Sequence, residues 1–218
     1  MSLPAILLLS TALGAAALPP PDFGAERVSP EARQVAAWAL ASGDHGRGHL
    51  VIVDKKRARV YVLSPAGRLL GAAPALLGLA RGDESVPGIG ERPLRSILPH
   101  ERTTPAGRFV AEPGTNLAGE DIVWVDYASA VSMHRVRATL KSERRLQRLA
   151  SPTPGDNRIS YGCINLPVRF YEQVLVPAVR AGAVVYVLPD TRALAEVFPP
   201  GRRPARPSPQ AVVEAGSV

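Results

Sequence analysis

The sequence has a single cysteine among its 218 residues, Cys163. One thiol cannot close an intramolecular disulfide, so the chain has no internal disulfide framework. A free cysteine is often buried as a small apolar group, whereas a thiol displayed on a loop is a candidate nucleophile. Composition alone favours the buried alternative, and the residues around Cys163 favour the nucleophile.

Other motifs are also missing. A single cysteine cannot supply the Cys-x-x-Cys pairs that many zinc sites use. The sequence contains no Gly-x-Ser-x-Gly nucleophile elbow, no glycine-rich phosphate loop and no dinucleotide fingerprint. We therefore expect neither a metal site nor a cofactor.

Lysine is scarce, since only Lys55, Lys56 and Lys141 occur, and arginine supplies most of the positive charge behind the formal net charge of +7. The basic residues are spread along the chain and no basic run is interleaved with aromatics, so nucleic-acid binding is not expected. An anionic polymer of the cell envelope suits a basic surface equally well. The length and the 46% hydrophobic content are sufficient for one globular domain.

Both ends of the chain predict segments outside this domain. Residues 1–17 are apolar and end in small residues, which is typical of a secretory signal peptide, with an N-terminal membrane anchor as the alternative. Residues 18–47 predict a Pro-rich spacer and a helix that follows Ser29 and ends at Gly43. Residues 191–218 predict a disordered, Pro-rich tail. We expect export to the periplasm or cell envelope, without stable membrane insertion after signal cleavage.

Residues 48–190 predict the domain itself. Apolar β-rich runs at 49–53 and 59–63, joined by a polar turn, predict a hairpin. Further strands are expected within 69–79, 103–110, 122–127 and 183–188. A helix should follow Pro167, kink at Pro177 and end at Gly182. This order predicts a mainly β fold, a β-sandwich or open barrel with peripheral helices at both ends of the chain.

Two segments interrupt the β pattern. Residues 81–102 predict a long loop, and loops of that length are usually functional or mobile. Residues 135–149 contain six basic residues against a single acid, and predict a basic helix or helical loop. Its apolar set is Leu140, Leu146 and Leu149. Its charges are either a solvated face or a surface for acidic groups.

Residues 160–165, Ser-Tyr-Gly-Cys-Ile-Asn, place the thiol on a shaped loop. Gly162 allows the backbone to approach a substrate closely, and Ser160 and Asn165 supply polar groups on either side. A thiol needs a base or a positive field to form the thiolate. Of the four histidines, His134 at the end of an expected strand is the best base, and a structural histidine is the alternative.

These residues resemble the catalytic domain of the L,D-transpeptidases, cysteine enzymes that cross-link bacterial peptidoglycan. Residues 160–165 match the family's Ser/Thr-His-Gly-Cys-hydrophobic-Asn motif except at Tyr161, and residues 104–109 are similar to its Thr-Pro-x-Gly-x-Phe turn. The resemblance covers roughly residues 48–189. Two departures stand out: Tyr161 replaces a histidine, and Cys163 follows His134 by 29 positions, an excess that an insertion at 135–149 accounts for.

The resemblance implies an exported cysteine acyltransferase in which Cys163 is the nucleophile, His134 its base, and backbone N–H groups around Gly162 stabilise the oxyanion. The substrate would be a peptidoglycan stem peptide, transferred through a thioacyl-enzyme by a monomer without a cofactor. The substrate-binding residues would be Ser160, Tyr161, Asn165 and Arg135. Two alternatives stay open: a carboxypeptidase or cysteine peptidase that uses water, and a non-catalytic peptidoglycan-binding envelope protein.

Overall fold

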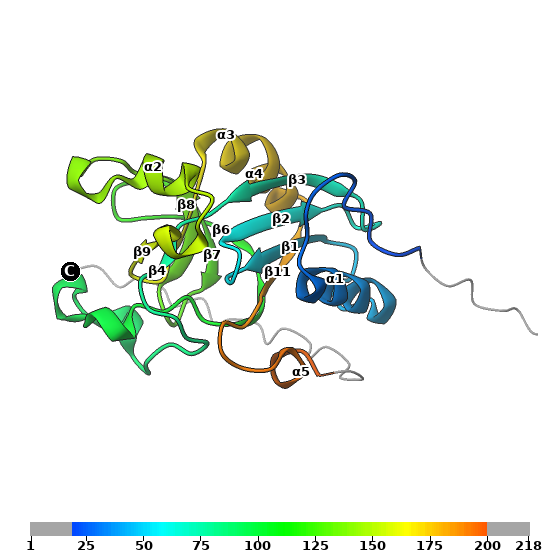
Figure 1. The fold of residues 1–218 in the computed structure, drawn as a ribbon, viewed down its shortest axis with the longest axis horizontal. Coiled ribbons are helices and arrows are strands. Elements are labelled where there is room, and N and C mark those ends of the chain that lie inside the picture. The colour runs from blue at the N-terminus through cyan, green and yellow to red at the C-terminus, as the bar shows by residue number, and fades with distance from the viewer. Residues whose placement is uncertain (1–18, 200–218) are drawn as a thin grey trace, which may run out of the picture.

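The computed structural model describes residues 19–199, so the predicted signal peptide and most of the predicted tail lie outside the described residues. Figure 1 shows a β-rich body with helices at its periphery. The helices are α1 (Pro30–Ser42), α2 (Arg145–Ala150), α3 (Val168–Phe170), α4 (Val176–Arg180) and α5 (Leu194–Val197). The strands are β1 (His49–Asp54), β2 (Arg59–Leu63), β3 (Leu69–Pro74), β4 (Leu77–Gly78), β5 (Gly107–Val110), β6 (Glu112–Thr115), β7 (Asp121–Asp126), β8 (Val131–Arg135), β9 (Arg158–Ser160), β10 (Ile164–Leu166) and β11 (Ala183–Val187).

Two sheets form the body. The larger has five strands in the order β3-β2-β1-β11-β5, and the smaller has four in the order β10-β8-β7-β6. The pairs β1–β11 and β10–β8 are parallel, and the other pairs within the two sheets are antiparallel. Strands β4 and β9 make a separate parallel pair. The mainly β class is confirmed as a sandwich, and no sheet of the described residues closes into a barrel.

Two apolar cores hold the layers together. The first, the inner core, lies between the sheets and includes Val51, Val53, Val123, Met133 and Ile164. The second, the outer core, lies between the larger sheet and α1 and includes Leu50, Ile52, Val35, Tyr61 and Tyr186. Successive residues of β1 therefore enter opposite cores, as a strand's alternation of side chains requires. The large sheet is buried on both faces for that reason.

The first helix ends as the sequence predicts. The Ser29 hydroxyl accepts a hydrogen bond from the Ala32 N–H at 3.0 Å, and Gly43 caps the other end in the left-handed region with φ 67°. The helix predicted within residues 18–47 is α1, and the residues before it, predicted as a spacer, contact the domain. Phe23 is buried in the outer core, and Asp22 makes a backbone bridge to Arg68. This segment packs as part of the domain because the larger sheet has a second apolar face to cover.

The start of the predicted tail is also corrected. Residues 194–197 form α5, and Phe198 is buried in the outer core. Its ring lies 6.1 Å from the rings of both Trp38 and Tyr186. Ordered structure therefore continues through Phe198, because this aromatic group has a core to enter.

The remaining predictions fare differently. The hairpin at 49–63 and the strand at 183–187 are confirmed, and the expected strand at 69–79 divides into β3 and β4. The helix after Pro167 contains a π-turn at Tyr171–Leu175, just before Pro177. The long loop contains only three short 3-10 turns, Ile89–Glu91, Leu94–Ser96 and Pro99–Glu101. Strand β6 was not expected, because Pro113 and Gly114 disfavour a strand.

Candidate active site

The candidate site lies on the face of the smaller sheet that points away from the inner core. Strands β8 and β10 are parallel, with His134 opposite Asn165 and Met133 opposite Ile164. Met133 and Ile164 enter the inner core. Because side chains alternate along a strand, His134 and Asn165 lie together on the other face, which we call the site face. Ser132 lies on it too, two residues before His134.

The structure brings the predicted nucleophile and base together. The half-buried Cys163 thiol lies close enough to the His134 ring for each group to shift the pKa of the other. The Ser132 hydroxyl lies 3.6 Å from the sulfur, as does the Ala130 carbonyl. The 29 positions between His134 and Cys163 therefore do not separate the two side chains, since the parallel pairing of β8 and β10 closes the connection.

The partner of the second ring nitrogen fixes the His134 tautomer. His134 Nδ1 lies 2.8 Å from the carbonyl oxygen of Arg135. A carbonyl only accepts, so Nδ1 carries the proton and donates it. In the neutral ring, Nε2 then carries the lone pair on the side of Cys163 and Asn165. His134 is thus oriented as a base for the thiol.

The pKa values of Cys163 and His134 shift in the directions that favour an ion pair between them. Burial alone would raise the pKa of the Cys163 thiol, but the hydrogen bond and charge of His134 outweigh it and lower the pKa below its ordinary value. Burial alone would lower the pKa of His134, but the hydrogen bond and charge of Cys163 and the Arg135 carbonyl raise it. Both directions favour a thiolate beside an imidazolium, the state in which a cysteine attacks a carbonyl.

Hydrogen bonds shape the loop that carries the thiol. The Ser160 hydroxyl donates to the Cys163 carbonyl at 2.6 Å and accepts from the Gly162 N–H at 3.1 Å. The Thr104 hydroxyl donates to the Gly162 carbonyl at 2.8 Å and accepts from the Gly78 N–H at 2.9 Å. Ser160 is therefore a loop-shaping residue, and the Gly162 N–H is already engaged by its hydroxyl.

Gly162 is required for a conformational reason. Its φ of +136° lies where residues with a side chain are strained, and a Cβ there would come within 2.7 Å of the Thr103 carbonyl oxygen. A buried ion cluster supports the neighbouring segment before β5: Lys55 Nζ donates to the Thr104 carbonyl at 2.7 Å and to Asp83 at 2.9 Å. The conformation of the loop thus depends on contacts with Thr103 and Thr104, and Thr104 is itself held by Gly78 and Lys55.

Tyr161 occupies the motif position where the resembling family has histidine. Its ring is 37% exposed and lies 4.0 Å beneath the Arg102 guanidinium of the long loop. None of the hydrogen bonds among residues 19–199 joins its hydroxyl to Cys163 or His134. His134 is on β8 and not on this loop, so a tyrosine at position 161 leaves His134 beside Cys163.

Arg135 contributes its carbonyl to the site, while its side chain is engaged elsewhere. Its guanidinium pairs with Asp121 and Glu172, each at 2.8 Å, and lies 4.7 Å above the Tyr171 ring. The sequence predicts that the Arg135 side chain binds substrate, but in the structure Asp121 and Glu172 already neutralise its positive charge. The sequence offered no sign that the backbone of Arg135 orients His134.

The basic segment 135–149 is partly ordered, as a 3-10 turn at Lys141–Glu143 followed by α2. Its expected apolar set is wrong for two members, since Leu140 is 60% and Leu146 57% exposed, while Leu149 is buried. Arg145 was not expected at the site, yet its Nη1 donates to Asn165 Oδ1 at 2.5 Å. The sequence contained only a weak sign of this contact, a charge on an inserted segment.

The other histidines lie outside the site. His45 and His49 stand four residues apart, a spacing that some zinc sites use. The ring nitrogens of His45 contact the carbonyls of Ala39 and Pro65 at 2.9 and 3.0 Å, which indicates a structural role. No group of three or more His, Cys, Asp or Glu side chains suited to a metal ion occurs within residues 19–199.

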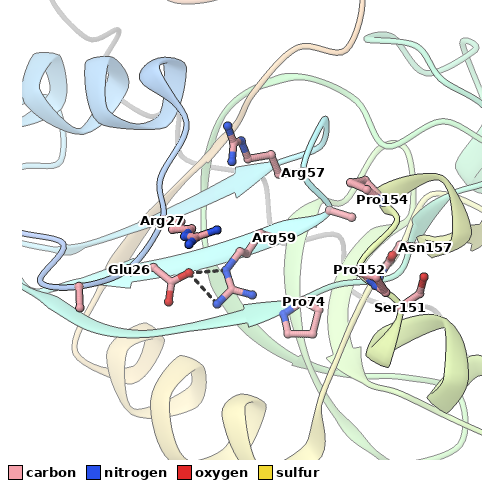
Figure 2. A pocket seen from close by; sticks show the side chains of 11 residues that line it. Glu26, Arg27, Arg57, Arg59, Pro74, Ser151, Pro152, Pro154 and Asn157 are labelled. Carbon is pink, nitrogen blue, oxygen red and sulfur yellow. Dashed lines mark hydrogen bonds and ion pairs between the residues drawn. The ribbon is translucent and has the colours of Figure 1, made fainter.

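A pocket of about 480 Å³ lies away from the thiol, between the larger sheet and residues 151–157. Figure 2 shows Arg27, Arg57 and Arg59 on one side and Ser151 and Asn157 on the other. Arg59 pairs with Glu26, and Arg27 and Arg57 are exposed. The pocket therefore has a solvated basic wall, and neither Cys163 nor His134 lines it. Among the helices of residues 19–199, none has the length and apolar character needed to cross a membrane.

Comparison with family models and with curated proteins finds no match to this sequence. One similar solved structure is an L,D-transpeptidase (residues 123–326) from Xylanimonas cellulosilytica, with 15% identity over 64% of this chain and 60% of that chain and a TM-score of 0.38. A second is the catalytic domain of an E. faecium L,D-transpeptidase, with 18% identity over 65% of this chain and 98% of that chain and a TM-score of 0.38. A third is the helical cell shape determining protein Pgp2 from Campylobacter jejuni, with 15% identity over 71% of this chain and 55% of that chain and a TM-score of 0.42. This chain thus spans about 60% of the first and about 55% of Pgp2. The likeness concerns the fold alone.

Proposed function

We propose that the protein is an exported cysteine acyltransferase of the L,D-transpeptidase type that acts on peptidoglycan stem peptides. The observation that carries the proposal is the arrangement of Cys163, His134 and the Arg135 carbonyl on the site face. The substrate class rests on the resemblance of residues 160–165 to the family motif. Peptidoglycan as substrate and export to the periplasm or cell envelope belong to the same proposal.

The reaction divides into two steps. In the first, the thiol proton passes to His134 Nε2 and the sulfur attacks a peptide carbonyl carbon. The tetrahedral intermediate collapses as His134 returns the proton to the leaving amine, which departs as an amino acid, and a thioester remains on Cys163. In the second, an acceptor amine gives a proton to His134 and attacks the thioester, which restores the thiol.

The oxyanion needs a donor other than the Gly162 N–H, which Ser160 already engages. We assign this role to the N–H of Cys163 itself, because the attacked carbonyl lies beside the residue that attacks it. One such donor contributes roughly 3 kcal/mol to transition-state stabilisation in comparable sites. Gly162 contributes its conformation, and Ser160 fixes the position of the Cys163 carbonyl.

Three alternatives differ in the acceptor or in the chemistry. Water in place of the amine gives an L,D-carboxypeptidase from the same thioester. A cysteine peptidase with an Asn or Asp that orients the histidine is disfavoured, because the Arg135 carbonyl holds Nδ1 and Asn165 faces Nε2. A non-catalytic envelope protein would require an unreactive thiol, which the lowered pKa of Cys163 argues against.

The test is intact-mass measurement after incubation with tetrapeptide muropeptides and, separately, with a carbapenem. We expect an adduct on wild-type protein and none on Cys163→Ala. A free amino acid together with a cross-linked product identifies a transferase, whereas the amino acid with a tripeptide identifies a carboxypeptidase. If wild type and Cys163→Ala are both retained on sacculi and neither donor gives an adduct, the protein is a non-catalytic peptidoglycan-binding protein instead.

A further inference from the structure

Arg145 reaches the site face from the segment between β8 and β9. Its Nη1 donates to Asn165 Oδ1 at 2.5 Å, and its Nε donates to Glu143 Oε2 at 2.6 Å. The Arg145 side chain is 15% exposed and that of Glu143 30%. This charge is therefore largely withdrawn from solvent and held between two partners, unlike the exposed arginines of the pocket in Figure 2.

The backbone of this segment is arranged to place both side chains. Arg144 lies between the 3-10 turn and α2 in the left-handed region with φ 51°, which costs a residue with a side chain about 1 kcal/mol. Arg148 Nε donates to the Glu143 carbonyl at 2.9 Å and closes the turn. A local strain that is retained beside a site suggests that the position of Glu143 and Arg145 matters.

The contact with Arg145 decides which way the Asn165 amide faces. A guanidinium only donates, so the oxygen of the amide must face Arg145. The amide nitrogen then lies 3.3 Å from the Cys163 carbonyl and 3.4 Å from His134 Nε2. Both contacts agree, because the carbonyl only accepts and the Nε2 lone pair accepts as well.

A reversed amide would change the chemistry of His134. The Asn165 amide oxygen would then face Nε2 and would stabilise a proton on that nitrogen. A protonated Nε2 cannot accept the proton of the Cys163 thiol. The present orientation places an amide N–H beside Nε2 instead. A donor at this position disfavours a proton on Nε2, so that nitrogen is kept in its unprotonated, accepting form.

We infer that Arg145, held by Glu143, is a positioning residue that fixes the Asn165 amide so that its N–H faces His134 Nε2 and keeps that nitrogen in its unprotonated, basic form. The inference deepens the proposed function, since it takes Cys163 and His134 as the reacting pair. The charge of Arg145 acts in the same direction, because it lowers the pKa of His134, as burial does, against the opposite effect of Cys163. The groups that face His134 are thus Cys163, Asn165, the Arg135 carbonyl and Arg145.

The experiment compares four proteins: wild type, Arg145→Met, Arg145→Lys and Arg137→Met. Arg137 is the matched control, because it belongs to the same segment and pairs only with Glu120 on the surface among the described contacts. NMR titration of the His134 ring follows its protonation directly and needs no substrate. Thermal unfolding checks that each variant is folded.

We expect the His134 titration of Arg145→Met to move to higher pH, because both the lost charge and the freed amide favour the protonated ring. Turnover of the stem peptide should fall about tenfold in kcat with little change in KM, since the base is misdirected rather than removed. Arg145→Lys should recover part of both effects. Arg137→Met should behave as wild type.

A His134 titration that is identical in wild type and Arg145→Met would overturn the inference. If Arg145→Met does not fold, Glu143→Gln replaces it: this variant keeps the charge of Arg145 but loosens its hold, and a smaller shift in the same direction is expected. Failure of the proposed function looks different. The wild-type protein would then form no adduct on Cys163, whereas the His134 titration would still decide the role of Arg145.

Discussion

The two sheets share one core and differ in what covers their other face. The larger sheet turns Leu50, Ile52 and Tyr61 toward α1, and this face is closed by apolar packing. The smaller sheet turns Ser132, His134 and Asn165 outward, where polar groups contact them: Cys163 contacts Ser132, and the guanidinium of Arg145 donates to Asn165. The same alternation of side chains thus builds a structural face in one sheet and a chemical face in the other. Substitutions on the two faces should separate stability from reactivity.

The largest expected effect is on the chemical face. His134→Ala should lower turnover by about 10²- to 10⁴-fold, because it removes the base. In wild type, the pH at which iodoacetamide labels Cys163 at half its maximal rate should lie below that of an ordinary thiol, since the pKa is lowered. In the variant it should move to higher pH, because burial is then opposed only by the hydrogen bonds of Ser132. A labelling profile that does not change between the two proteins would place the base elsewhere.

The next effect belongs to the structural face. Leu50 is fully buried in the outer core, so Leu50→Ala should lower the free energy of unfolding by about 2 to 5 kcal/mol. The labelling rate of Cys163 in the folded protein should stay at the wild-type value. Urea unfolding and iodoacetamide labelling at low temperature measure the two quantities. A large change in labelling of the folded variant would show that the faces are coupled.

A smaller effect is expected at the loop. Gly162→Ala should destabilise the protein by roughly 1 to 3 kcal/mol through a strained backbone and the close approach to Thr103. Turnover should fall as well, because the thiol moves with the loop. Gly155→Ala is the control, since a Cβ there meets nothing within 4 Å and the φ of Gly155 lies outside the left-handed range. Equal stability of the two variants would remove the conformational role of Gly162.

The smallest effect is expected at the position of the missing motif histidine. Tyr161→Phe keeps the ring beneath Arg102, 4.0 Å from its guanidinium, and should change turnover less than about threefold. Tyr161→Ala removes the stacking and should cost about 0.5 to 1 kcal/mol of stability. Turnover assays measure the effect on catalysis and thermal unfolding measures the effect on stability in both variants. A loss of turnover in Tyr161→Phe comparable to that of His134→Ala would assign the hydroxyl a chemical role.

Much of the fold follows from local patterns. The hairpin and the ends of α1 are predictable because alternation, Ser29 and Gly43 act over a few residues. Strand β6 is not, since Pro113 and Gly114 become a strand only through pairing with β7. The start of the tail was misjudged for a similar reason: Phe198 is ordered by a core assembled from distant segments.

The site shows the same division. Cys163 and His134 could be selected from residue type and motif, but their contact depends on the parallel pairing of β8 with β10, which no local pattern encodes. The carbonyl of Arg135 carries no side-chain signature. Arg145 looked like one more surface charge until the fold placed it against Asn165.

The position of β11 has a consequence for how the chain folds. This strand lies between β1 and β5, so the middle of the larger sheet is filled by residues 183–187, which come more than 130 residues after their partner β1. The sheet cannot close, and neither core can be completed, until this segment has joined. Contacts of such long sequence separation slow folding. A chain that is threaded through a membrane from its N-terminus would therefore stay unfolded until nearly all of the domain had emerged, which is the state that such transport requires.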